Sequence, residues 1–386
     1  MSRQALRMGM IGGGPGSFIG AIHRIAARMD GMIEMVCGSF SSDPDKSAKA
    51  GKELGLEATR CYANYEEMIA REGELPAEQR MDFVSIVTPN HVHFAPAMAA
   101  LEAGFHVVLD KPMTLTLDEA KQLAEKIESS GKLFCLTHTY TGYPMVKQAR
   151  QMVLNGDFGK IRKVYVEYPQ AWLSTPLEQD GNKQAGWRTD PSKSGKGGAM
   201  GDIGTHAFNL AEYVSGLQVT RLCADLHTKV PNRVLDDDGA MLLRFGNGAS
   251  GVLMATQIAA GEENNIKIRV YGEKGGLEWQ QEDANTLQVK WLDRPKEIYR
   301  AGTPYLSSYA EVNARTPAGH PEGYLEAFAN HYQNFARTLL AQLNDTEPLP
   351  EWQDYPGTED GLRGMAFVEI AVENSKLDQK WSEFKY

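Results

Sequence analysis

Residues 7–137 alternate between short apolar runs and amphipathic stretches, and this alternation restricts the possible folds more than any other feature of the chain. The runs with strand character are Met8–Ile11, Ile33–Cys37, Phe83–Val87, His106–Leu109 and Leu133–Leu136. Helical patterns follow at Ile19–Met29, Lys46–Leu54, Phe94–Ala103 and Leu117–Ser129. Apolar strands separated by helices are typical of a parallel sheet covered on both faces. Ligands of such sheets bind beyond the carboxyl ends of the strands, so the residues that follow each run are candidate site residues.

The pattern changes after about residue 155. Runs with strand character now follow one another without helices between them, at Lys163–Tyr168, Ala240–Phe245, Ser250–Thr256 and Ile266–Tyr271. Turn signals accompany them at Asp238-Gly239, Gly246-Asn247-Gly248 and Lys274-Gly275-Gly276. This arrangement predicts an antiparallel sheet, and two helical stretches near Tyr324–Leu343 and Gly361–Leu377 end the chain. In the first half, the polar stretch Arg71–Arg80 contains a proline and is predicted to be a surface loop.

Length and composition narrow the class of protein. The chain has 386 residues and a formal net charge of −10, which suits more than one domain and argues against a nucleic-acid or membrane-surface partner. No apolar run approaches the roughly 18 residues of a membrane span. The N-terminus leads into a strand without a signal-peptide core. Cys37, Cys61, Cys135 and Cys223 are scattered, which predicts reduced, structural thiols in a cytoplasm.

A glycine-rich segment, Gly12-Gly13-Gly14-Pro15-Gly16-Ser17-Phe18-Ile19-Gly20, joins the first strand to the first helix. Glycines at such a turn let the backbone approach a pyrophosphate, which the helix N-terminus attracts. The spacing departs from Gly-x-Gly-x-x-Gly because Ser17 stands where the third glycine belongs. An ordinary strand-to-helix turn is the alternative. The predicted cofactor-binding residues here are Gly12, Gly14, Pro15, Gly16, Ser17 and Phe18.

The end of the second strand bears on the choice of dinucleotide. An Asp or Glu at this place normally holds the adenosine ribose, and here the position is taken by Ser39. No carboxylate therefore repels a 2′-phosphate at this position, and Ser41, Ser42 and Lys46 are candidates to bind one. Both NAD and NADP stay open. Asp43 is interpreted as a cap of the following helix.

Two further motifs follow strands at the predicted ligand edge. Thr88-Pro89-Asn90-His91-Val92-His93 comes after the third strand, and its alternative is a proline turn in which Asn90 caps a helix. Asp110-Lys111-Pro112 comes after the fourth strand. A lysine there can bind a hydroxyl and stabilise developing alkoxide charge, although an ordinary surface lysine is the alternative. The candidate cofactor residues are Thr88, Pro89, Asn90, His93, Asp110 and Lys111.

Asp202 and His206 lie four residues apart where the glycine-rich run 197–204 enters an apolar helix. Residues four apart share a helix face, and a histidine beside a carboxylate suits proton abstraction from an alcohol. Asp202 as a plain N-cap and His206 as a core histidine are the alternatives. No nearby Cys, His or Glu completes a metal motif, so no metal site is expected.

Taken together and in this order, the glycine-rich opening, Thr88-Pro89-Asn90-x-x-His93, Asp110-Lys111-Pro112 and Asp202-x-Gly-x-His206 resemble the glucose–fructose oxidoreductase/inositol dehydrogenase (Gfo/Idh/MocA) family. The resemblance implies a Rossmann-type dinucleotide-binding domain over 1–138. It implies an α+β domain with a large open, mostly antiparallel sheet over 139–386, where the sheet often joins dimers or tetramers. It implies a catalytic trio of Lys111, Asp202 and His206.

Two departures from the family pattern stand out. The familiar Glu before the lysine is Asp110 here, and an Asp often found three residues after the histidine is Asn209. Asn209 is therefore a candidate substrate contact, and the preferred sugar is expected to differ. Further candidate substrate contacts lie in loops, where ordinary turn or capping chemistry is the alternative. They are Tyr140, Tyr143, Trp187, Arg188, Asp190 and His320.

These residues predict an NAD(P)-dependent dehydrogenase of a sugar, sugar derivative or inositol, working in either direction. His206 removes the hydroxyl proton while hydride leaves the same carbon, Asp202 supports the imidazole, and Lys111 holds the reacting oxygen. Two alternatives stay open. One is a redox-assisted glycoside lyase or hydrolase with a retained NAD, and the other is a non-catalytic dinucleotide-binding regulator.

Overall fold

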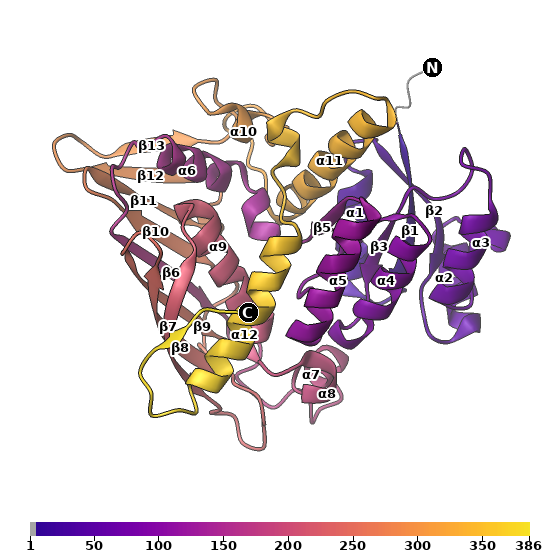
Figure 1. The fold of residues 1–386 in the computed structure, drawn as a ribbon, viewed down its shortest axis with the longest axis horizontal. Helices are drawn as coiled ribbons and strands as arrows, with labels where there is room; N and C mark the ends of the chain where they lie inside the picture. The colour runs from indigo at the N-terminus through magenta and orange to yellow at the C-terminus, as the bar shows by residue number, and fades with distance from the viewer. Residues whose placement is uncertain (1–4) are drawn as a thin grey trace. The chain divides into compact units, whose positions relative to one another are not determined.

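The computed structural model describes residues 5–386, which form two compact units. The first unit contains the chain up to Thr139 together with Tyr324–Leu362, and the second contains Tyr140–Gly323 and Arg363–Tyr386. The sequence had assigned everything after residue 138 to one domain. The difference arises from the helix α11 (Tyr324–Leu343), which packs on α1 (Phe18–Arg28) of the first unit (Figure 1). Its buried Phe328, Tyr332 and Phe335 belong to the core of that unit.

The first unit holds a five-stranded sheet in the order β2-β1-β3-β4-β5, and each neighbouring pair is parallel. The strands are β1 (Leu6–Gly12), β2 (Ile33–Ser39), β3 (Phe83–Val87), β4 (His106–Leu109) and β5 (Phe134–Leu136). The other helices of this unit before residue 139 are α2 (Pro44–Glu53), α3 (Tyr65–Glu74), α4 (Phe94–Glu102) and α5 (Leu117–Ser130). The strand order changes direction at β1, as in doubly wound folds, so the predicted parallel sheet is confirmed.

The prediction of a surface loop over Arg71–Arg80 was wrong in its first part, because α3 continues through Glu74. Asn64 caps this helix by accepting from the Glu67 N–H at 2.8 Å. Glu72 is completely buried and accepts bonds from Arg60, from the Tyr62 hydroxyl at 2.9 Å and from the Met81 N–H at 2.8 Å. A buried, paired glutamate looks like a surface residue in the sequence because its partners are distant in the chain.

The second unit is built on a nine-stranded sheet in the order β13-β12-β11-β10-β6-β9-β8-β7-β14 (Figure 1). All neighbours are antiparallel except β6 and β9, which are parallel. The strands are β6 (Lys163–Pro169), β7 (Val219–His227), β8 (Asp238–Phe245), β9 (Ser250–Thr256), β10 (Lys267–Tyr271), β11 (Gly275–Gln280), β12 (Thr286–Trp291), β13 (Glu297–Arg300) and β14 (Ser382–Glu383). The predicted, mostly antiparallel sheet is confirmed. The expected turn at Asp238-Gly239 was wrong, because both residues pair within β8.

Helices α6 and α9 pack on this sheet and leave its other face open. Strand β8 shows the two sides: Met241 and Leu243 are buried, whereas Leu242 between them is 40% exposed. The remaining helices are α6 (Pro144–Leu154), α7 (Lys183–Arg188), α8 (Pro191–Ser194), α9 (Thr205–Ser215), α10 (Ser308–Glu311) and α12 (Thr358–Asn374). Helix α9 lies against β6, β9 and β10, and His206 in its first turn contacts Tyr168 near the end of β6.

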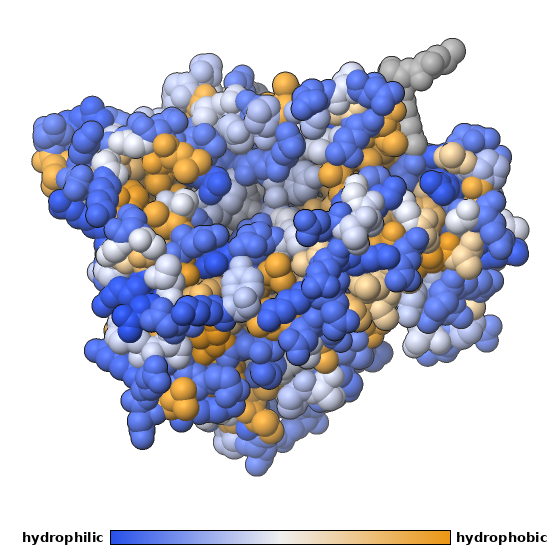
Figure 2. All heavy atoms as spheres, viewed as in Figure 1, coloured by the Kyte–Doolittle hydropathy of each residue, from blue (hydrophilic) through white to orange (hydrophobic). Residues whose placement is uncertain are grey.

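The visible surface is mostly hydrophilic, with hydrophobic side chains in smaller groups between the polar ones (Figure 2). Over residues 5–386, no helix combines the length and apolarity that crossing a membrane requires.

Candidate active site

The glycine-rich turn between β1 and α1 has the backbone of a phosphate-binding loop. Gly12, Gly13 and Gly16 have φ angles of 83°, 69° and 84°, which a residue with a side chain rarely adopts. A Cβ at Gly20 would lie 2.3 Å from the Gly13 Cα, so a glycine at position 20 lets α1 pack closely on the turn. A Cβ at Gly16 would meet nothing within 4 Å. The loop therefore offers bare backbone beside a helix N-terminus, which fits a pyrophosphate.

The residues around this loop complete the helix entry. Ser17 is the N-cap of α1 and accepts from the Gly20 N–H at 3.2 Å, while Phe18 in the first turn is 67% exposed. From within α1, Arg24 donates to the Gly13 carbonyl and ties the loop to its helix. Partial burial lowers the pKa of this arginine, which nevertheless stays charged at neutral pH.

At the end of β2, Ser39 is 5% exposed. Asp43 caps α2 as predicted, accepting from Asp45 and Lys46, and its carboxylate lies 3.2 Å from the Lys46 ammonium. The backbone bond from Lys46 is the main reason that the pKa of Asp43 lies below its usual value. The Ser41 hydroxyl accepts from the Asp43 N–H at 3.1 Å. Lys46, a candidate to bind a 2′-phosphate, thus has an acidic neighbour in Asp43.

The ends of β3 and β4 are joined by His93, whose ring is 1% exposed. Its Nδ1 lies 2.8 Å from the Pro112 carbonyl oxygen and its Nε2 lies 2.9 Å from that of Thr88. His93 is also the N-cap residue of α4, so the alternative in which Asn90 caps that helix was wrong. Asn90 instead begins a short 3-10 turn after Pro89. His93 therefore holds together two of the predicted cofactor-binding segments.

Asp110 supports Lys111 from the preceding position. Its Oδ1 accepts from the Lys111 N–H at 2.9 Å and from the Thr137 hydroxyl at 3.0 Å, and it lies 3.9 Å from His23 Nε2. Burial alone would raise the pKa of Asp110, but His23 and the charge of Lys111 outweigh it and lower the pKa to about 2. The carboxylate is therefore ionised at neutral pH and fixes the backbone that carries Lys111.

Behind Asp110 lies a buried polar cluster that the sequence did not reveal. The Tyr332 hydroxyl of α11 lies 2.7 Å from both His23 Nδ1 and the Ser85 Oγ. All three side chains are at most 1% exposed. Burial raises the pKa of Tyr332 far above its usual range, so its hydroxyl stays protonated. The returning helix α11 thus supplies part of the support beneath the Lys111 segment.

In the second unit, Asp202 lies in a single π-helical turn, Met200–Gly204, which runs directly into α9. Such turns are rare and occur frequently at functional sites. The cap of this helix comes from elsewhere in the chain: Asp236 accepts from the Gly198 N–H at 2.7 Å and from the Met200 N–H at 2.8 Å. The alternative of Asp202 as the N-cap was therefore wrong, because the residue lies inside the turn.

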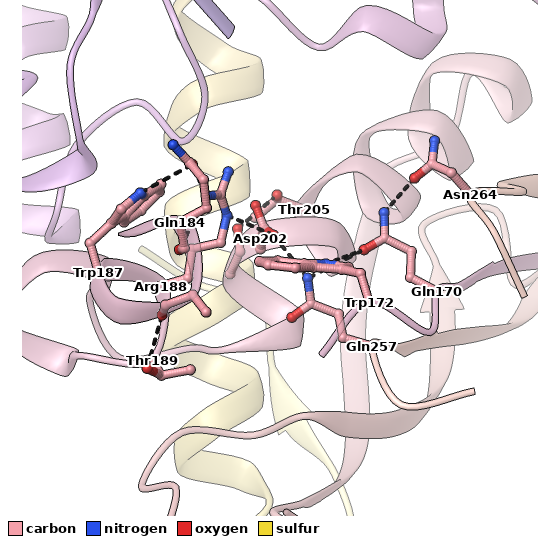
Figure 3. Close-up of polar contacts among 12 residues, drawn as sticks. Gln170, Trp172, Gln184, Trp187, Arg188, Thr189, Asp202, Thr205, Gln257 and Asn264 are labelled. Atoms are coloured by element: carbon pink, nitrogen blue, oxygen red, sulfur yellow. Dashed lines mark hydrogen bonds and ion pairs between the residues drawn. The ribbon is translucent and has the colours of Figure 1, made fainter. Parts of the chain in front are cut away.

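Two donors face one oxygen of the Asp202 carboxylate (Figure 3). Arg188 Nε donates at 3.2 Å and Gln257 Nε2 donates at 2.9 Å, both to Oδ2. The Arg188 guanidinium carbon lies 4.2 Å from the ring centre of Trp187 and 5.7 Å from that of Trp172. The arginine is thus held by aromatic faces as well as by the carboxylate. Together these contacts fix the position of Asp202.

His206 lies in the first turn of α9, is 8% exposed and contacts aromatic rings. Its ring centre lies 5.0 Å from that of Tyr140 and 6.3 Å from that of Tyr168, in edge-to-face geometry. Tyr143 stacks on Tyr140 with ring centres 6.5 Å apart. Asn209, three residues further along α9, is 6% exposed. Aromatic rings therefore pack against the imidazole, and little of it is exposed to solvent.

Two other predicted substrate contacts have local partners. Asp190 caps α8 by accepting from the Ser192 N–H at 3.0 Å and pairs with Lys193 at 3.0 Å. The Ser192 hydroxyl and the Lys193 bond lower the pKa of Asp190 to about 2. His320 is exposed, in the loop before α11. These local contacts neither support nor oppose a role of Asp190 or His320 in substrate binding.

Among residues 5–386, no group of three His, Cys, Asp or Glu side chains could hold a metal ion.

Comparison with known proteins agrees with this geometry. Residues 6–138 match a family profile described as an oxidoreductase family with an NAD-binding Rossmann fold, and residues 146–278 match the GFO/IDH/MocA C-terminal domain. The uncharacterized oxidoreductase YfiI of Bacillus subtilis is 32% identical over 98% of this chain and 97% of its own. The chain belongs to the Gfo/Idh/MocA oxidoreductase family.

Other members of the Gfo/Idh/MocA family are similar over most of their length. A levoglucosan dehydrogenase of Pseudarthrobacter phenanthrenivorans is 30% identical over 74% of this chain and 76% of its own. An inositol dehydrogenase homolog of Azotobacter vinelandii, solved with NAD⁺, superposes with a TM-score of 0.93 at 34% identity, over 99% of this chain and 98% of that one. The same homolog was solved with NADH and myo-inositol, and that structure gives a TM-score of 0.90.

Within this Gfo/Idh/MocA oxidoreductase, the sequence interpretation missed the partners of the catalytic candidates. Gln257, Gln170 and Trp172 follow strands in the second unit, and Asn264 lies before β10. The parallel pairing of β6 with β9 brings Gln170 and Gln257 together, and no local sequence pattern indicates a parallel pair inside an otherwise antiparallel sheet. Asp236 was also missed, because it lies 38 residues from Gly198 along the chain and no local sequence pattern indicates this contact.

Replacing Asp236 with alanine is expected to lower the free energy of unfolding by about 1–3 kcal/mol, because two buried N–H groups of the Gly198–Met200 segment lose their acceptors. The same segment begins the π turn that carries Asp202, so kcat should fall as well. Urea unfolding at neutral pH measures the first effect. Asp225→Ala is the control, because Asp225 is 80% exposed on β7. Equal stabilities of the two variants would contradict the capping assignment.

Proposed function

We propose that this oxidoreductase oxidises a ring hydroxyl of a sugar, sugar derivative or inositol, or catalyses the reverse reduction, with His206 as general base. The observation that carries the proposal is that a buried imidazole lies four residues after a carboxylate to which two side chains donate, where a π turn runs into α9. Relatives named for levoglucosan and inositol support a cyclic polyol as substrate.

The cofactor that the Rossmann domain implies is NAD or NADP, which would supply the hydride acceptor. The glycine turn with its open backbone at Gly16 fits the pyrophosphate, as described above. Ser39 at the end of β2 carries no carboxylate that would repel a 2′-phosphate, so it does not select NAD over NADP. The neighbouring residues are expected to determine which dinucleotide binds. The residues proposed to hold the dinucleotide are Gly12, Gly14, Pro15, Gly16, Ser17, Phe18, Ser39, Ser41, Ser42, Lys46, Thr88, Pro89, Asn90, His93, Asp110 and Lys111.

The proposed roles follow from the chemistry of the side chains. His206 takes the proton of the hydroxyl that is oxidised, and Asp202 stabilises the imidazolium that results. Lys111 donates to the reacting oxygen and offsets the negative charge that develops there. The ionised Asp110 keeps the Lys111 backbone in place through its 2.9 Å bond. No metal enters this scheme.

The remaining substrate contacts are proposed from placement and side-chain type. Tyr140 lies against His206 and Tyr143 stacks on Tyr140, while Arg188 donates to Asp202 and lies over the ring of Trp187. Aromatic faces suit the apolar side of a sugar ring, whereas the guanidinium suits its hydroxyls. The proposed set is Tyr140, Tyr143, Trp187, Arg188, Asp190, Asn209 and His320.

We also propose a homodimer or homotetramer assembled through the open face of the nine-stranded sheet. Leu242 on β8 is 40% exposed on that face, and its neighbour on β9 is Val252. An exposed apolar row on a sheet is a common interface. The scattered cysteines Cys37, Cys61, Cys135 and Cys223, with no Cys-x-x-Cys pair among them, support a reducing compartment such as the cytoplasm.

The proposal predicts absorbance of reduced nicotinamide when the protein is mixed with NAD⁺ or NADP⁺ and a substrate from a panel of hexoses, anhydrosugars, glycosides and inositols. The ratio of kcat/KM for the two cofactors decides between NAD and NADP. Absence of turnover in both directions, with both cofactors and across the panel, would refute the dehydrogenase. Cleavage of a glycoside without net reduction would instead support the redox-assisted lyase or hydrolase.

A further inference from the structure

A chain of side-chain amides begins at the Asp202 carboxylate. Gln170 and Gln257 are the residues directly after β6 and β9, whose last residues Pro169 and Thr256 are partners in the parallel ladder. Both amides therefore leave the sheet at the same edge. The Gln170 N–H donates to the Thr256 carbonyl at 2.8 Å, which continues the ladder by one residue. Gln257 is 2% exposed and Gln170 is 8% exposed, so water competes little for their bonds.

The hydrogen-bonding partners of each side-chain amide determine which way its oxygen and its nitrogen point. A carboxylate only accepts, so Gln257 presents its Nε2 to Asp202, at 2.9 Å. The second N–H of Gln257 then points to Gln170 Oε1 at 3.3 Å. An indole only donates, and Trp172 Nε1 donates to the same Gln170 oxygen at 3.0 Å (Figure 3). The indole N–H of Trp172 and the amide N–H of Gln257 can only donate, so both require that the Gln170 oxygen points towards them.

The chain then continues to the aromatic rings beside His206. With its oxygen engaged, Gln170 donates through Nε2 to Asn264 Oδ1, which also accepts from the Tyr168 hydroxyl at 2.7 Å. Asn264 Nδ2 in turn donates to the Tyr140 hydroxyl at 3.2 Å. Tyr140 and Tyr168 are hydrogen-bonded to each other and both contact the His206 ring. The chain therefore links the carboxylate to the aromatic rings that surround the imidazole.

We infer that Gln257 is a positioning residue, which with Gln170 holds the Asp202 carboxylate in the orientation that supports His206. This inference rests on the proposed function. Arg188 and Gln257 both donate to Asp202 Oδ2, and the Arg188 side chain is 23% exposed, whereas Gln257 is buried and held by a second bond. A hydrogen bond to a charged group contributes more than one between neutral groups. Without Gln257, the carboxylate loses the buried hydrogen bond at 2.9 Å.

The test compares three substitutions of glutamine by methionine, which keeps the length of the side chain and removes its amide. Gln257→Met is expected to lower kcat about 10- to 100-fold with little change in KM, as the loss of a bond to a charged group predicts. Gln170→Met should lower kcat by a smaller factor, because Gln257 keeps its bond to Asp202 but loses its support. Gln288→Met is the matched control, since Gln288 lies on β12 and bonds to the exposed Lys296. Titration of NADH binding counts the folded enzyme in each sample.

Equal kcat values for Gln257→Met and Gln288→Met would overturn the inference. A crystal structure of each variant provides a second readout that needs no substrate. The Asp202 carboxylate is expected to leave its rotamer in Gln257→Met and to keep it in Gln288→Met, and the same rotamer in both would also overturn the inference. If the wild-type protein turns over no polyol, that result refutes the proposed function. The Asp202 rotamer in the crystal structures of the two variants then decides by itself whether Gln257 positions the carboxylate. If Gln257→Met does not fold, the kcat of Gln170→Met decides: a wild-type value overturns the inference.

Discussion

Replacing His206 with asparagine is expected to lower kcat by about 10²–10⁴-fold, the usual contribution of a general base. Asparagine keeps a polar side chain of similar reach but cannot take the hydroxyl proton at neutral pH. The aromatic contacts of Tyr140 and Tyr168 surround the site, and asparagine is smaller than the imidazole, so the fold should tolerate the change. NADH binding should stay near the wild-type level, because the glycine turn belongs to the first unit.

Steady-state kinetics on the substrate identified from the panel measures this effect, and fluorescence titration with NADH measures cofactor binding. His227→Asn is the matched control, because that histidine is an exposed residue of β7 and is expected to leave kcat unchanged. A kcat for His206→Asn within a few-fold of the control would contradict the assignment of the base. Loss of NADH binding together with activity would indicate a damaged fold instead.

The free energy of unfolding is expected to fall steeply as the pH drops from about 6.5 towards 4, because the buried His138 and the partly buried His106 of the first unit resist protonation. Burial is the main cause that lowers the pKa of His138 to about 3, and the charges of Lys111 and His331 lower it further. Burial, followed by the charge of Lys132, lowers the pKa of His106 to about 4. His106 Nδ1 also accepts from the Leu133 N–H at 2.9 Å, a bond that a protonated ring cannot make.

The sign follows from proton binding. In the unfolded chain each histidine titrates near 6.5, whereas in the folded protein His138 and His106 take up a proton only near pH 3 and pH 4. Between these values the unfolded state binds more protons, so acid favours unfolding. The stability that the neutral rings contribute is complete above pH 6.5 and is lost as the pH falls through the folded values. Each histidine contributes a slope of about 1.4 kcal/mol per pH unit in this window.

Urea unfolding between pH 7.5 and 4 measures the slope, and His138→Asn should reduce it by about 1.4 kcal/mol per pH unit. The control is His91→Asn, because His91 is exposed and its ring is solvated in the folded and in the unfolded protein. An identical pH dependence of wild type and His138→Asn would contradict the prediction. The window ends at pH 4 because carboxylates such as Asp110, with a pKa of about 2, contribute below it.

Much of the first unit was predictable because its signals are local. Buried parallel strands require apolar runs, and the helices between them require amphipathic periods, so β1 to β5 appear in the sequence close to their observed limits. The glycine turn is also a local signal, since the positive φ angles of Gly12, Gly13 and Gly16 require this residue type. Helix α3 was missed in part because the buried Glu72 looks like a surface residue until its partners Arg60 and Tyr62 are known.

The sequence by itself determined which side chains can do chemistry: a histidine four residues after an aspartate, a lysine after a buried strand, and a glycine turn before a helix. Only the tertiary structure decided what holds them. Asp236 caps the helix that Asp202 was a candidate to cap, α11 returns to place Tyr332 behind Asp110, and the β6–β9 pairing brings Gln257 and Gln170 to Asp202. The physical reason is distance along the chain. A helix period or a turn depends on neighbouring residues, whereas a hydrogen bond between residues 55 apart exists only after the strands have paired.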